Sequence, residues 1–165
     1  IYKYFENKEN LFLTVIHFAV EKLKDVLKEI MQSEDDLETR IRKIIIAIQS
    51  QTRNNVPLTK LYNEMSTENR SNLVWKIASD MENATAGLYA SFIEDAQKAG
   101  EVRADVDPKA FAFFLDNLFL LLQFSYACEY YKERMKIYIR EDIFDNDELV
   151  VEQLMKFIRG AFFLK

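Results

Sequence analysis

The chain has 165 residues, 49% of them hydrophobic and 30% charged, which is typical of one globular domain with a sizeable core. With only 3 Gly and 2 Pro there is little material for turns, which favours a few long helices over many short strands. The net charge of −5 disfavours nucleic-acid binding by this part of the chain, because phosphate binding needs a basic face.

The first half of the chain shows helical periodicity in its apolar residues. They recur at three- and four-residue spacing over roughly residues 7–31, with Asn7 as a candidate N-cap. The acidic segment 33–36 resembles a capped helix start, and the next apolar stripe continues to about residue 53. Two amphipathic helices are therefore predicted before residue 55.

Two further helices are predicted before the Gly100 region. Pro57 suits the start of a short third helix, because proline is well tolerated in a first helical turn. A fourth helix is predicted over about residues 68–99, with Gly100 as its stop.

The second half begins again at Asp107-Pro108, an N-cap followed by proline. The following helix is the most apolar segment, from Ala110 to Ala127, and its pattern leaves open a continuation to about Ile139. A polar connector over 142–147 and a last helix over roughly 148–164 complete the chain. We find no internal repeat and no pair of strands, so the predicted fold class is all-α.

The fifth predicted helix is apolar around nearly its whole circumference. Only Lys109, Asp116 and Gln123 form a narrow polar stripe, at seven-residue spacing. Such a helix must be covered on nearly all sides. We expect it to pack inward on one face and against a second subunit on another; the alternative is a central core helix in a monomer.

Aromatic residues are abundant, with 13 Phe, 8 Tyr and 1 Trp. Rings that carry a polar group suit pockets for flat or apolar molecules, although each ring could equally be ordinary core. Asn117 lies within the apolar fifth helix and needs a hydrogen-bond partner, either a ligand or a group within the protein. The candidate pocket residues are Tyr62, Trp75, Met81, Tyr89, Phe114 and Asn117.

Catalytic and metal-binding residues are not indicated. His17 is the only histidine and is expected on a solvated helix face, and Cys128 is expected to be an inert core thiol. The segment Asp35-Asp36-x-Glu38 superficially resembles a metal-binding motif of all-α prenyl-transferring enzymes, but a first helical turn explains its acids equally well. We therefore expect no enzyme activity, no cofactor and no bound metal.

The lone cysteine, Cys128, gives no disulfide framework, as expected of a reducing cytoplasm. The sequence contains no signal peptide and no run of about 18 apolar residues, so neither secretion nor a membrane span is expected. The predicted localisation is cytoplasmic.

Two motifs carry a family resemblance. Residues 1–12, IYKYFENKENLF, resemble the end of the DNA-reading helix and the start of the next helix in TetR-family (tetracycline-repressor-like) transcriptional regulators. Residues 96–108, AQKAGEVRADVDP, are similar to that family's link between its two longest C-terminal helices. The order of the motifs and the helical pattern between them extend the resemblance along much of the chain.

The resemblance implies a division of labour along the chain. Residues 1–10 would be the end of a helix-turn-helix domain whose remainder is missing, since such a motif needs roughly 20 further residues. Residues 11–165 would form a ligand-binding and dimerisation domain of about six helices, which dimerises through a four-helix bundle of the last two long helices. The residues that match DNA-backbone contacts are Tyr2, Lys3, Tyr4 and Lys8, with Lys3 at a position more often aromatic in the family.

The implied function is that of a ligand-responsive transcriptional regulator, expected to act as a repressor. Its implied partners are a second copy of the chain, operator DNA bound through the missing N-terminal domain, and a mainly apolar small-molecule effector; no membrane is implied. The expected interface residues are Phe119, Gln123, Leu154, Phe157, Ile158 and Ala161. Two alternatives remain: an all-α protein-interaction module without a ligand, and a magnesium-dependent enzyme of the prenyl-transferring kind.

Overall fold

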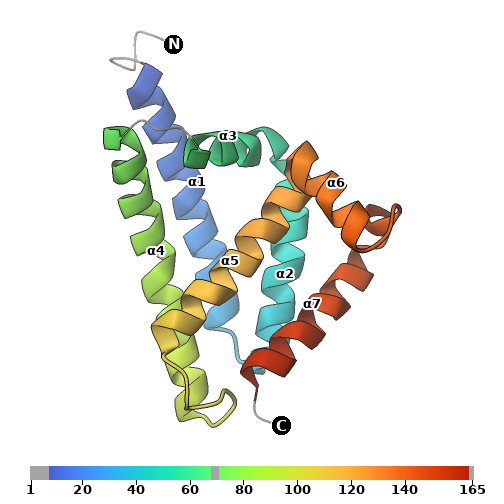
Figure 1. Ribbon diagram of the computed structural model, residues 1–165. Coiled ribbons are helices and arrows are strands. Elements are labelled where there is room, and N and C mark those ends of the chain that lie inside the picture. Colours follow the sequence, from blue (N-terminus) through green and yellow to red (C-terminus); the bar gives the residue numbers. More distant parts are fainter. Residues whose placement is uncertain (1–7, 68–70, 164–165) are drawn as a thin grey trace.

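The structure, a computed structural model, describes residues 8–67 and 71–163 as a bundle of helices (Figure 1). The elements in chain order are α1 (Lys8–Met31), α2 (Leu37–Asn54), α3 (Val56–Thr67), α4 (Ser71–Lys98), α5 (Pro108–Ala127), α6 (Glu129–Tyr138), the 3-10 turn η1 (Ile143–Asp145) and α7 (Asp147–Phe162). Within those ranges the only strand-like pairing is an isolated bridge between Val102 and Phe163. The all-α prediction is confirmed, with seven α-helices in place of about six.

Local capping residues define several helix ends, as the sequence predicts. The Asp36 side chain accepts a hydrogen bond from the Thr39 amide at 2.7 Å and so caps α2. Asp107 accepts one from the Ala110 amide at 2.9 Å at the start of α5. Gly100 follows α4 with a φ of 74°, a left-handed conformation that a side chain would strain. The predicted boundaries of α2, α4 and α5 are therefore confirmed to within a few residues.

The fifth helix does not continue to Ile139. Cys128 has extended backbone angles, φ −102° and ψ 128°, so it ends α5 and precedes the separate helix α6. The connector that follows is also not purely polar, because Ile143 on η1 is buried in the core. The bend at Cys128 turns the chain back toward α7 and brings Ile143 to the core, which a straight helix would have prevented (Figure 1).

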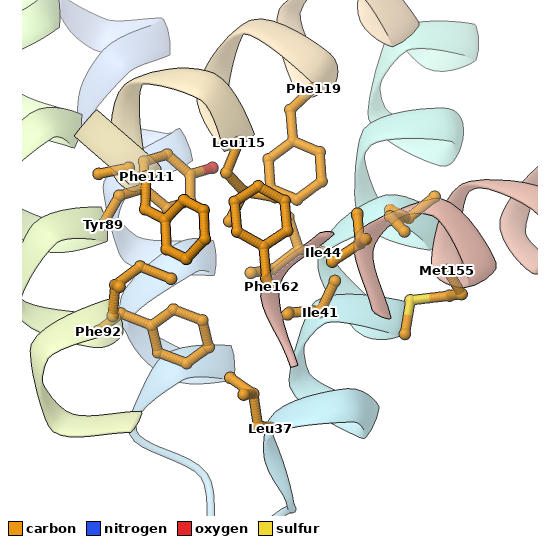
Figure 2. Packing of buried hydrophobic residues seen from close by; sticks show 14 of the residues in the cluster. Leu37, Ile41, Ile44, Tyr89, Phe92, Phe111, Leu115, Phe119, Met155 and Phe162 are labelled. Atoms are coloured by element: carbon orange, nitrogen blue, oxygen red, sulfur yellow. The ribbon is translucent and has the colours of Figure 1, made fainter. Parts of the chain in front are cut away.

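Helix α5 runs diagonally across the bundle and contacts α2, α3, α4 and α6 (Figure 1). Its inner face meets apolar side chains of α2, α4 and α7, which point toward one another in Figure 2. The rings of Phe111 on α5 and Phe162 on α7 have centroids 4.0 Å apart. By length and composition alone α5 could cross a membrane, but here it packs against four other helices.

A polar network joins α2, α5 and α7 beside this core. The Tyr126 hydroxyl donates to Asp147 Oδ1 at 2.8 Å and accepts from Gln49 Nε2 at 2.8 Å. Arg53 donates to both Asp147 carboxylate oxygens, at 3.2 and 2.7 Å, and lies over the Tyr126 ring. Tyr126 and Gln49 are buried, so their hydrogen bonds must be met inside the protein.

Replacing Tyr126 with Phe should lower the free energy of unfolding by about 1–2 kcal/mol, because it removes two hydrogen bonds within the network. Urea denaturation followed by circular dichroism measures this change. The matched control is Tyr138→Phe on the exposed part of α6, with an expected change within about 0.5 kcal/mol. Equal stabilities of the two variants would show that the network does not stabilise the fold.

Candidate functional site

Aromatic residues gather where α5 faces α3 and α4. The ring centroid of Tyr62, on α3, lies 5.8 Å from that of Phe124 on α5. The ring of the buried residue Tyr89, on α4, lies 6.0 Å from that of Phe119 on α5. Both contacts are tilted, a geometry that lets the rings pack while the hydroxyl groups remain available for hydrogen bonds. Three helices thus contribute aromatic side chains to one region.

A carboxyl group lies in the same region. Burial raises the pKa of Asp116 on α5 from 3.8 to about 6, and the nearby negative charge of Glu82 on α4 raises it further. Both effects oppose ionisation. Most carboxyl groups with a shifted pKa in the described residues show the opposite direction, because they pair with a base or cap a helix. Asp116 is therefore held in an environment that does not stabilise its charge.

The negative charges of these carboxyl groups affect the pKa values of Tyr62 and Tyr89. Burial raises the pKa of Tyr89, and the charge of Asp116 adds to the effect. Burial also raises the pKa of Tyr62, and the negative charges of Glu82 and Asp116 add to the effect. The four groups act on one another across α3, α4 and α5, so they form one site, which we call the α3–α4–α5 site (Tyr62, Glu82, Tyr89 and Asp116).

The predicted pocket residues divide between this site and the outer surface. Tyr62 and Tyr89 belong to the α3–α4–α5 site. Phe114 is 58% exposed and packs on Phe113, with ring centroids 5.7 Å apart, so it lies on the outer surface of α5 and not in this site. Asn117 Nδ2 donates to the Phe113 carbonyl at 2.7 Å, which satisfies the amide within its own helix. The side chains of Trp75 and Met81, on α4, lie outside the described residues.

The predicted interface residues also divide. Phe157 is 60% exposed on α7, and Leu154 and Ala161 lie partly buried beside it. Gln123 on α5 is partly buried. By contrast, two of the predicted interface side chains are buried in the core: Phe119, 3% exposed, and Ile158, 0% exposed. Consecutive residues of an α-helix point in directions about 100° apart. Ile158 therefore points away from the side of α7 that carries Phe157.

A concave feature lies elsewhere, between α5, α6, η1 and α7. It is an open apolar hollow of about 320 Å³ whose walls include Leu118, Leu121, Tyr138, Ile139, Leu149 and Leu154. Of the predicted pocket residues whose side chains the structure describes, none lines it, and Leu154 is the predicted interface residue that does. Periodicity could not reveal this hollow, because it depends on the bend at Cys128.

The remaining predicted positions have structural contacts or lie outside the description. Tyr2, Lys3 and Tyr4 precede the described residues, and α1 begins at Lys8, whose side chain is not described. No statement about DNA contact therefore rests on the structure.

The acidic segment before α2 takes part in ordinary contacts. Asp35 pairs with Lys43, Asp36 caps α2, and Glu38 pairs with Arg159. The described part of the chain contains no group of three or more His, Cys, Asp or Glu side chains arranged to hold a metal ion. Burial raises the pKa of the Cys128 thiol, which fits the expectation of an unreactive core cysteine.

Asp116 was not among the predicted pocket residues, because the sequence places it in a polar stripe. A signal was present, since Asp116 and Asn117 interrupt a run of apolar residues. The sequence cannot show that Asp116 turns toward α3 and α4 whereas Asn117 bonds to its own helix.

The raised pKa of Asp116 predicts a pH-dependent stability. The carboxyl group of Asp116 binds its proton more tightly in the folded protein than in the unfolded chain. Protonated Asp116 therefore contributes most to the free energy of unfolding below about pH 4, and this contribution is lost between about pH 4 and 6. Asp116→Asn removes this dependence and should be more stable than the wild type by up to about 3 kcal/mol at pH 7. The difference should vanish near pH 4.

Chemical denaturation across pH 4 to 8 measures this difference. Asp25→Asn, at an exposed position on α1, is the control for the removal of one carboxylate from the chain. An Asp116→Asn difference that is independent of pH would contradict the assigned environment.

Comparisons with known proteins agree with the fold. No family model matches the chain. The sequence is 25% identical over 126 residues to YhgD of Bacillus subtilis (strain 168), an uncharacterized HTH-type transcriptional regulator, and the match covers 76% of this chain and 65% of YhgD. The chain thus spans less than two thirds of the length of this curated relative.

A structural relative covers nearly the whole chain. The crystal structure of a TetR family transcriptional regulator from Chloroflexus aurantiacus J-10-FL is similar with a TM-score of 0.71 and 15% sequence identity, over 99% of this chain and 77% of that one. Both relatives are transcriptional regulators, which agrees with the resemblance in residues 1–12 and 96–108. The chain is therefore TetR-like: it has the fold of a TetR family regulator, and its sequence relative is an HTH-type transcriptional regulator.

Proposed function

We propose that the chain is the regulatory body of a TetR-type transcriptional regulator, in which ligand binding controls DNA binding. The observation that carries the proposal is the TetR-like fold, which extends over 99% of the chain. In this proposal residues 1–10 end the DNA-binding domain, with Tyr2, Lys3, Tyr4 and Lys8 positioned at the DNA backbone. Residues 11–165 form the body, and operator DNA is bound through the N-terminal domain.

The body forms a homodimer through the outer surfaces of α5 and α7. Helix α5 exposes Phe113, Phe114 and Leu121, and α7 exposes Phe157. Exposed aromatic residues on neighbouring helices are typical of protein interfaces rather than of solvated surfaces. A second copy would cover them and complete a four-helix bundle.

The effector binds in the α3–α4–α5 site. Tyr62, Tyr89 and the rings around them suit a mainly apolar molecule. Asp116 suits an effector that also carries a basic or hydrogen-bond-donating group, because such a group would offset the unfavourable environment of the carboxylate. Among mainly apolar compounds, lipophilic cations therefore fit better than fatty acids.

Ligand binding reaches the DNA-binding end through α4 and α1. Helix α1 packs along α4, which carries Tyr89 and Glu82 (Figure 1). A ligand that moves α4 relative to α5 must therefore shift α1, and with it the two DNA readers of a dimer. These need a separation near 34 Å to reach successive major grooves. Repression is lifted only if the ligand binds the shifted state more tightly.

A thermal-shift screen of lipophilic cations, flavonoid-like aromatics and fatty acyl compounds tests the site. A compound at about 100 times its dissociation constant should stabilise the fold by about 2.7 kcal/mol. Cationic hits should lose at least about tenfold in affinity with Asp116→Asn, since a charge-assisted contact is worth about 1.5–3 kcal/mol. Tyr62→Ala should weaken all hits.

Asn117→Leu provides the comparison on the same helix. Its amide faces its own backbone, so affinity should not change. Loss of affinity in Asn117→Leu with none in Asp116→Asn or Tyr62→Ala would move the site to the outer face of α5. A screen without any stabilising compound would favour a ligand-free interaction module.

Replacing Phe157 with Asp tests the dimer. The charge would be buried in the interface, so the dimer dissociation constant should rise by at least about 100-fold. Sedimentation velocity at micromolar concentration measures the change. Phe18→Asp is the matched control, because Phe18 on α1 is similarly exposed (63%) and lies outside the proposed surface. A folded Phe157→Asp variant that remains as dimeric as the control would remove α7 from the interface.

A further inference from the structure

Helix α6 leaves large apolar side chains uncovered. None of its residues is buried, and its C-terminal end presents Ile137, 81% exposed, Tyr138, 73% exposed, and then Ile139. Single exposed apolar residues are common, but three large ones at one end of a helix are unusual on a solvated surface. This patch was not part of the dimer surface expected from the last two long helices.

The same helix forms one wall of the apolar hollow. Tyr131, Met135, Tyr138 and Ile139 line it from the α6 side. The opposite walls come from Leu118 and Leu121 on α5 and from Leu149 and Leu154 on α7. Leu121 also belongs to the proposed dimer surface, so hollow and surface are continuous. An apolar hollow beside the exposed ring of Phe157 is a self-complementary arrangement, which a symmetric dimer requires.

The charges of this segment permit self-association. A symmetric contact brings identical patches together, so a patch with a net charge would repel its copy. Over residues 129–142 the basic and acidic side chains are equal in number: Lys132, Arg134, Lys136 and Arg140 against Glu129, Glu133, Glu141 and Asp142. Ion pairs within the segment join Lys132 to Glu129 at 3.3 Å, Lys136 to Glu133 at 2.9 Å and Arg140 to Asp142 at 2.8 Å. The chain as a whole carries −5, so this neutrality is local.

We infer that α6 is a third dimerisation element, and that a second copy of this chain fills the hollow between α5, α6 and α7. The inference rests on the dimer proposed above and adds α6 and η1 to its interface. The occupant is a second copy because the hollow adjoins the proposed α5–α7 surface and the segment 129–142, which forms its α6 wall, carries no net charge. Apolar side chains of the partner would displace water from the hollow, which lowers the free energy of the dimer.

The test is a double variant of the full chain, Tyr138→Glu with Ile139→Glu. Both side chains line the hollow and are exposed in one subunit, so the charges should not disturb the fold of the subunit. The dimer dissociation constant, measured by sedimentation equilibrium, should rise at least about tenfold. Ile137→Glu is the control, since Ile137 lies on the same helix and is more exposed but does not line the hollow. Its constant should stay within about twofold of the wild type.

Circular dichroism and thermal melting of each variant show whether it is folded. Should the double variant unfold, hydrogen–deuterium exchange of the wild type replaces it, with slower exchange of residues 129–139 expected on dimerisation. An unchanged constant for a folded double variant, or exchange independent of concentration, overturns the inference. A control that dissociates as strongly as the double variant overturns the role of the hollow.

The dimer proposal and this inference fail in different ways. If Phe157→Asp separates the subunits and the double variant does not, the α5–α7 dimer stands without α6. If only the double variant separates the subunits, α6 is part of the interface and the exposed surface of α7 is not. A wild type that is monomeric at about 50 µM overturns both and leaves the hollow to a different partner.

Discussion

The need to cover helix α5 on nearly all sides governs this fold. No single neighbour can cover a helix that is apolar almost all round, so α2, α3, α4 and α6 each take one part of its surface. The inner side meets the core, and the side toward α3 and α4 meets aromatic rings. One side, with Phe113, Phe114 and Leu121, stays open in a single subunit. The bundle, the candidate ligand site and the candidate dimer surface are three consequences of this one requirement.

Two polar side chains on α5, Tyr126 and Asp116, lie in opposite kinds of environment: one stabilises the polar group and the other does not. Tyr126 is buried but exchanges hydrogen bonds with Gln49 and Asp147, so its environment satisfies it and joins three helices. Asp116 is partly buried near another acid, and its pKa rises to about 6 because its charge is not stabilised. A buried group whose environment opposes its charged form is a candidate for binding rather than for stabilising the fold. That contrast, rather than the number of aromatic residues, places the candidate site between α3, α4 and α5.

The α3–α4–α5 site is connected to the N-terminal end of the described chain through the contact between α4 and α1, which are distant in sequence. Helix α4 carries Glu82 and Tyr89 and packs along α1, which begins at Lys8 (Figure 1). On the other side of the bundle, the bend at Cys128 sends α6 across the gap between α5 and α7 and creates the apolar hollow. The candidate ligand site and the candidate dimer surfaces therefore lie on different faces of α5, so in the proposed function a ligand would alter helix packing without competing with a second subunit.

The sequence by itself determined several helix ends and the fold class. Asp36, Asp107 and Gly100 act through hydrogen bonds or backbone angles within a few residues, so local sequence suffices to predict them. Only the tertiary structure decided which sides of α5 face inward: Phe119 lies in the core, whereas Phe114 is exposed. A helix that is apolar on every side carries no periodic signal for its orientation, and the positions of its neighbours supply it. For the same reason the hollow beside α6 follows from the bend at Cys128 and the burial of Ile143, which are set by packing between segments distant in sequence.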